Sequence, residues 1–109
     1  METAQEIFEK TARHLFTQGK QSKGVIGVRN HEMCAYRFEK DGEVLRCAAG
    51  LHIPVKMYRL EMEGKALRQI IETYNVPRIF VDYEFLITKL QTVHDMDYNW
   101  ENTKKMRQA

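Results

Sequence analysis

The sequence has no long apolar run and no strong excess of charge of either sign. Its longest apolar runs extend over only a few residues, far short of the ~20 that a membrane-spanning helix needs. The N-terminus carries acidic residues and no apolar core, so we expect no signal peptide. These absences predict a cytoplasmic protein with no membrane partner, in which the two cysteines are reduced thiols.

Familiar catalytic and cofactor-binding motifs are also missing. The sequence contains no P-loop, no G-x-G-x-x-G and no H-E-x-x-H motif. It also lacks the second His–Asp set that a metal-dependent phosphohydrolase requires. No cofactor is therefore indicated, and the sequence favours a non-enzymatic protein over an enzyme.

Length and composition predict a single folded domain over residues 1–109. The chain is 43% hydrophobic and 29% charged, which is ordinary for a globular protein of this size. The formal net charge is +2, but residues 20–60 carry eight basic and four acidic side chains, an excess of four. This weak excess fits a solvated face, or a surface for an acidic partner or nucleic acid.

Helical periodicity appears on both sides of a central β-pattern. Residues 3–18 predict an amphipathic helix that begins with a capping box of Thr3 and Glu6 and ends at Gly19. Further helices are predicted over 54–58, 63–74 and 79–94, and a short edge strand over 25–28. A last helix is predicted to carry Trp100 and Met106. The inner stripe predicted for helix 79–94 consists of Val81, Phe85, Leu86, Leu90 and Val93.

The clearest β-pattern surrounds Asp41-Gly42, the favoured dipeptide of a type I′ hairpin turn. Apolar residues alternate with polar ones on both sides of this turn, namely Cys34, Tyr36 and Phe38, then Leu45, Cys47 and Ala49. A two-residue turn pairs Lys40 with Glu43, Phe38 with Leu45 and Tyr36 with Cys47, so that all apolar side chains share one face.

The predicted fold class is α+β. It consists of a β-hairpin or a three-stranded antiparallel sheet packed against several α-helices. Arg37 and Arg46 are expected on the hairpin face opposite to the cysteines.

The two cysteines and two nearby histidines offer ligands for a metal. His31-x2-Cys34 and Cys47-x4-His52 supply the thiolate and imidazole groups that a tetrahedral zinc prefers. The same cysteines also fit into an apolar core as small buried thiols. A disulfide is a third option, although the predicted register makes the pair diagonal, at about 7–8 Å. We favour core thiols, and a zinc-stabilised domain or small hydrolase stays an alternative.

His94-Asp95, at the end of the predicted helix 79–94, is a second candidate for acid–base or metal chemistry. His94 and His52 are also the candidate bases for a cysteine nucleophile. The simpler interpretation is a histidine near a helix C-terminus that gains from the helix dipole, followed by an aspartate that helps to end the helix. We favour this second interpretation.

A set of these residues forms a longer pattern. It comprises Cys34-x-Tyr36-Arg37, Asp41-Gly42, Cys47-Ala48-x-Gly50, Ile53-Pro54, Tyr58, Glu63-Gly64, Leu90-Gln91-x-x-His94-Asp95 and Trp100. The pattern resembles a family of small tailed-phage and prophage proteins without an assigned activity. The resemblance implies an accessory protein of the bacterial host cytoplasm that binds and inhibits or redirects a host protein. It transfers no functional residue.

The sequence therefore predicts a binding protein. The predicted surface combines the basic hairpin face with the loop that follows the hairpin, and its residues are Arg37, Arg46, Lys56, Met57, Tyr58 and Arg59. The alternative is a nucleic-acid-binding protein that uses the same basic hairpin face.

Overall fold

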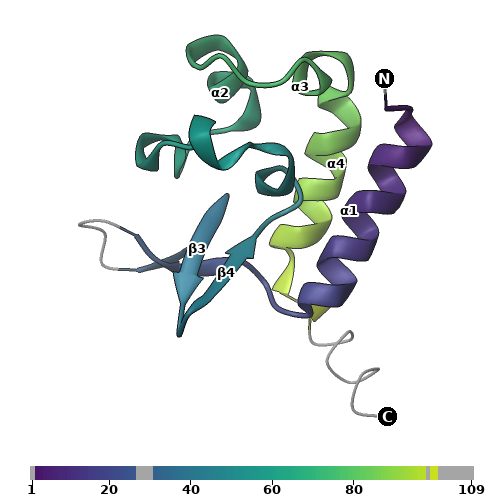
Figure 1. Ribbon diagram of the computed structural model, residues 1–109. Helices are drawn as coiled ribbons and strands as arrows, with labels where there is room; N and C mark the ends of the chain where they lie inside the picture. The colour runs from purple at the N-terminus through teal and green to yellow at the C-terminus, as the bar shows by residue number, and fades with distance from the viewer. Residues whose placement is uncertain (1, 27–30, 98, 101–109) are drawn as a thin grey trace.

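The computed structural model describes residues 2–26, 31–97, 99 and 100. Helix α1 (Ala4–Gln18) and helix α4 (Glu84–Asp95) lie side by side, and the short helices α2 (Leu67–Thr73) and α3 (Ile79–Asp82) lie beside the start of α4 (Figure 1). Strands β1 (Lys23–Val25) and β2 (Glu32–Cys34) form one antiparallel pair, and β3 (Arg37–Lys40) and β4 (Glu43–Arg46) form another. Three 3-10 helices join β4 to α2, at Gly50–His52, Val55–Met57 and Leu60–Met62. The predicted α+β class is confirmed.

No helix within the described part of the chain combines the length and the apolar character that crossing a membrane requires.

Helix α1 begins and ends as the sequence predicts. The hydroxyl of Thr3 accepts a hydrogen bond from the Glu6 N–H at 3.2 Å, and the Glu6 carboxylate accepts the Thr3 N–H at 3.0 Å. Gly19 takes a left-handed conformation with φ of 63°, and its N–H bonds to the carbonyl of Leu15. The capping box and the glycine stop are both confirmed.

The β3–β4 hairpin has the predicted register. Lys40 pairs with Glu43 and Phe38 with Leu45, and the turn residues Asp41 and Gly42 have φ of 51° and 79°. Arg37 and Arg46 are direct cross-strand partners, so their side chains share one face of the hairpin.

The predicted extension of this hairpin to Cys34 is wrong. Cys34 lies on β2 and pairs with Lys23 of β1, and the described strands form two two-stranded sheets in place of a three-stranded one. The strand is interrupted at Ala35 and Tyr36 because their backbone groups have other partners. Ala35 N–H bonds to the Ser22 carbonyl, and Tyr36 N–H bonds to the carboxylate of Glu63.

Glu63 holds the loop after the hairpin against the start of β3. Its side chain is 4% exposed and accepts the N–H groups of Tyr36 and Arg37 at 2.9 and 3.1 Å. The Tyr58 hydroxyl donates to the same carboxylate at 2.6 Å. Burial and this hydrogen bond raise the pKa of the Tyr58 phenol. One carboxylate thus connects the start of β3 to the loop that holds Tyr58 and Glu63, more than 20 residues later in the sequence.

We expect Tyr58→Phe to lower the free energy of unfolding by about 1 kcal/mol, because one donor to the buried Glu63 carboxylate is lost while two remain. Urea unfolding at pH 7 measures the change. Tyr74→Phe is the matched control, since Tyr74 also packs against the core but is no donor to Glu63. An equal loss in both variants would contradict this role for Tyr58.

The core lies between α1, the 3-10 segments and helices α2 to α4. Its fully buried side chains include Ile7, Met62, Ile70, Phe80 and Ile87. The predicted helix 79–94 is divided at Tyr83, whose ψ of 30° and φ of −126° end α3 before α4 begins.

The predicted inner stripe of this region is largely wrong. Val81, Phe85 and Val93 are 61%, 76% and 51% exposed, whereas Phe80, Ile87 and His94 are fully buried. The break at Tyr83 separates the phases of α3 and α4, and α4 turns a face that contains the polar His94 toward the core. The spacing of apolar residues does not predict this buried face of α4, because the face includes a polar histidine whose burial depends on its hydrogen bonds.

Candidate functional site

The four metal-ligand candidates taken from the sequence do not come together. His31 is exposed, and Cys34 is half-buried on β2. Cys47 is buried, and its sulfur accepts the Gly50 N–H at 3.3 Å. His52 is buried against α1, where its Nε2 lies 2.8 Å from the Thr11 hydroxyl. The zinc alternative gains no support from this arrangement, because Cys34 lies on β2, in a different sheet from the β3–β4 hairpin.

Both cysteines are free thiols, so the disulfide alternative is also excluded. Burial raises the pKa of Cys47 to about 12, as expected for a small core residue.

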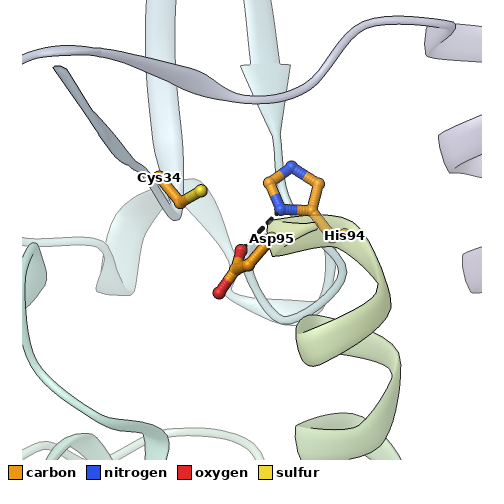
Figure 2. A group of neighbouring side chains, drawn as sticks. All are labelled: Cys34, His94 and Asp95. Atoms are coloured by element: carbon orange, nitrogen blue, oxygen red, sulfur yellow. Dashed lines mark hydrogen bonds and ion pairs between the residues drawn. The ribbon is translucent and has the colours of Figure 1, made fainter. Parts of the chain in front are cut away.

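A different group of chemically capable side chains gathers where β2 meets the end of α4. The ligand atoms of Cys34, His94 and Asp95 all lie within 4.8 Å of one another. Figure 2 shows the Cys34 sulfur facing the two α4 residues, with the Asp95 carboxylate between the sulfur and the imidazole. Among the residues with a described placement, this is the cluster whose composition could suit a metal.

The protonation of His94 opposes metal binding in this cluster. The Ser22 N–H donates to His94 Nε2 at 3.0 Å, so that nitrogen carries no proton. His94 Nδ1 therefore carries the proton and donates it to Asp95 Oδ1 at 2.8 Å. A metal on Nδ1 would move the proton to Nε2, where it would face the Ser22 N–H. The residues present do not fit a zinc site, and neither nitrogen is available as a general base.

Cys34 is not an activated nucleophile. Burial and the neighbouring Asp95 carboxylate raise the pKa of its thiol to about 11, so the sulfur is protonated at neutral pH. The Gln21 side-chain amide donates to the sulfur at 3.6 Å. The Cys34 thiol is therefore a neutral, polarisable group in the cluster.

Asp95 is oriented by hydrogen bonds from two side chains of α4. Its Oδ1 accepts hydrogen bonds from Gln91 Nε2 at 3.0 Å and from His94 Nδ1 at 2.8 Å. Each donor is itself held by a backbone N–H, since Ala49 donates to Gln91 Oε1 and Ser22 donates to His94 Nε2. The second oxygen points away from His94 (Figure 2). Asp95 also lines a cavity of about 270 Å³ between α4 and the start of α2.

A second cavity lies on the other side of α4. This α1–α4 groove has a volume of about 300 Å³, and none of the described residues that line it carries a carboxylate, ammonium or guanidinium group. Its lining residues are Phe8, Ala12, Leu15, Phe16, Leu90, Val93, His94, Asn99 and Trp100. The sequence pattern placed two of these residues, Leu90 and Val93, on the inner stripe of the predicted helix 79–94. The signal for the groove was the width of the apolar stripe on α1, which extends beyond the buried Ile7 and Thr11 to Phe8 and Phe16.

The residues predicted to bind a partner occupy mixed environments. Lys56 and Arg59 are exposed, and Arg37 and Arg46 are half-buried on one hairpin face. Met57 packs against the core, and the Tyr58 hydroxyl is bonded to Glu63. Their role in binding stays a prediction.

Comparisons with protein-family models, curated proteins and solved structures find no match. The resemblance to tailed-phage proteins therefore stays a prediction, and the case for a function depends on the geometry of this chain.

Proposed function

We propose that this protein is a non-enzymatic protein-binding module whose α1–α4 groove receives an amphipathic helix of a partner protein. The observation that carries the proposal is the exposed apolar lining of the groove. Phe8, Phe16 and Val93 are 46%, 59% and 51% exposed, although burying such side chains is worth about 1.5–3 kcal/mol each. Contiguous exposed apolar surface of this kind is typical of an interaction site.

The shape of the groove favours a helical partner. Helices α1 and α4 lie side by side (Figure 1), and a third helix packs naturally into the groove between two others. Helix α1 has 15 residues and is therefore about 22 Å long, enough to contact several turns of a partner.

The charged residues next to the groove indicate which charges the partner helix should carry beside its apolar stripe. Arg13 precedes Phe16 by three positions on α1, and Lys89 precedes Val93 by four positions on α4, so each lies beside a lining residue. Glu9 also lies on this side of α1, which leaves a basic excess of one. An apolar stripe bordered by acidic residues is the complementary partner.

The resemblance described above suggests that the partner is a bacterial host protein. The groove itself does not identify that protein. The hairpin residues Arg37 and Arg46 lie outside the lining of the groove. We therefore place the primary contact on the groove and treat the basic hairpin face as a separate surface.

Trp100 provides the test, because it is the single tryptophan of the chain and lines the groove. Two model amphipathic helices with one apolar face, flanked by glutamate or by lysine, are titrated against the protein at low salt. We expect a saturable change in Trp100 emission, with the glutamate-flanked helix binding at least tenfold more tightly. Phe16→Glu should abolish binding, whereas Val55→Glu should not, since Val55 is exposed outside the groove.

Three results would overturn the proposal. The first is a Trp100 emission that stays constant with both helices, and the second is equal binding by Phe16→Glu and Val55→Glu. The third is a dimer in light scattering that Phe16→Glu converts to a monomer, because a second copy of the chain then occupies the groove.

A further inference from the structure

The cavity beside Asp95 is separate from the α1–α4 groove and shares no lining residue with it. We call it the Asp95 pocket. Its polar wall comes mostly from α4, and its apolar wall comes from the ring of Tyr36 and from Ala66 and Leu67 at the start of α2. Cys34, Gly64, Lys65, Thr88, Gln91 and Thr92 complete the lining.

Three oxygen acceptors follow one line along the polar wall. Thr88, Thr92 and Asp95 are spaced four and three residues apart on α4, so they lie on the same face of the helix. The Thr92 hydroxyl donates its proton to the Thr88 carbonyl at 3.0 Å, which leaves its oxygen as an acceptor. Asp95 accepts Gln91 Nε2 and His94 Nδ1 on Oδ1, and the Cys34 thiol is a further hydrogen-bond partner of its carboxylate. A carboxylate has about four acceptor positions, so Asp95 can still accept another donor.

The charged side chains that line the pocket are Asp95 and Lys65. Asp95 is the last residue of α4, where the helix dipole already places a partial negative charge. His94 is neutral in the tautomer that Ser22 imposes, so it does not cancel the carboxylate. Lys23 is paired with Asp97 at 3.2 Å, and the Lys65 ammonium is directed to the Glu61 carbonyl.

We propose that the Asp95 pocket binds a primary ammonium group carried on an aliphatic stem. An ammonium has three N–H donors and no acceptor. Thr92 and Asp95 are three residues apart on α4, about 4.5 Å along the helix axis, so one ammonium can donate to both oxygens while its third N–H faces water. A guanidinium fits less well, because its paired donors need both carboxylate oxygens and Oδ1 is already occupied. The stem would lie along the ring of Tyr36 and along Leu67.

The same chemistry occurs in a lysine side chain of a protein and in a free alkylamine. NMR titration at pH 7 with n-butylammonium, 1,5-diaminopentane and a short peptide with a single lysine compares these sources. Butylguanidinium and butyltrimethylammonium are the controls for donor geometry and for charge without N–H groups. We expect saturable shifts of the backbone amides from Thr88 to Asp95, with both control cations at least tenfold weaker than n-butylammonium.

Variants connect the shifts to the acceptors. Asp95→Asn should weaken n-butylammonium binding at least tenfold, and Thr92→Val several-fold. Asp82→Asn is the control, because Asp82 is an exposed aspartate of α3 outside the pocket. Circular dichroism verifies that each variant is folded.

Tighter binding of the peptide than of the diamine would identify a partner's lysine as the ligand, and the reverse would identify a free amine. Equal binding of butyltrimethylammonium, or no shift with any amine, would overturn the proposal. So would zinc that shifts the same amides and displaces the amine. None of these outcomes depends on the α1–α4 groove, so the two proposals fail independently.

Discussion

Replacing Gly50 by alanine is expected to destabilise the fold on the order of 3–4 kcal/mol. A Cβ at this position would lie 1.8 Å from the carbonyl oxygen of Tyr36 and 2.7 Å from its carbonyl carbon. Both atoms belong to the backbone, so no side-chain rotation relieves the clash. The Tyr36 backbone is itself held by Glu63, which prevents it from moving away.

Urea unfolding of the variant measures this effect, and Gly42→Ala is the matched control. A Cβ on Gly42 meets no atom within 4 Å, and its only cost comes from a φ of +79°. That cost is about 1–2 kcal/mol. If the two alanine variants lose equal stability, the contact between Gly50 and Tyr36 is not as close as the structure indicates.

Stability is expected to fall as the pH decreases from about 6.5 to about 4, because His52 is buried in its neutral form. Burial, and secondarily the charge of Lys10, lower its pKa from 6.5 to about 4, against a small opposing effect of Glu2. Since the unfolded chain takes up the proton first, acid favours unfolding, and the stabilisation is fully present only above pH 6.5. The maximum loss is about 3 kcal/mol. His14 adds to it, since burial also lowers its pKa.

His52→Gln removes this titration, and its amide can still donate to the Thr11 oxygen. The Thr11 hydroxyl gives its own proton to the Ile7 carbonyl, so it acts as an acceptor toward residue 52. The free energy of unfolding at pH 7 and at pH 4.5 is compared for wild type and variant. We expect a smaller difference for the variant, and an unchanged difference would show that other groups cause the acid sensitivity.

Local features of the fold were predictable from the sequence. The capping box of Thr3 and Glu6 depends on a three-residue spacing, and the hairpin register depends on the two residues Asp41 and Gly42. Each is decided within a few residues of chain, so pattern and propensity suffice. The confirmed α+β class follows from the same short-range patterns.

The partners of Cys34 and His94 were not predictable, because they depend on contacts between distant segments. Cys34 pairs with Lys23, and its side chain meets Asp95 more than 60 residues away. The core-facing side of α4 includes the buried His94 and the half-buried Gln91, which accept hydrogen bonds from the Ser22 and Ala49 N–H groups. A hydrophobicity pattern treats both as exposed polar residues, and it therefore assigned the wrong face to the core.

His94 gives α4 the property of linkage between the two proposed sites. Its ring lines the α1–α4 groove, and its Nδ1–H orients the carboxylate of the Asp95 pocket. A helix bound in the groove that shifts the His94 ring would also shift the Asp95 carboxylate. In the same way, an amine bound to Asp95 would shift the His94 ring in the groove. By thermodynamic reciprocity, the factor by which the bound helix changes the affinity for the amine equals the factor by which the bound amine changes the affinity for the helix.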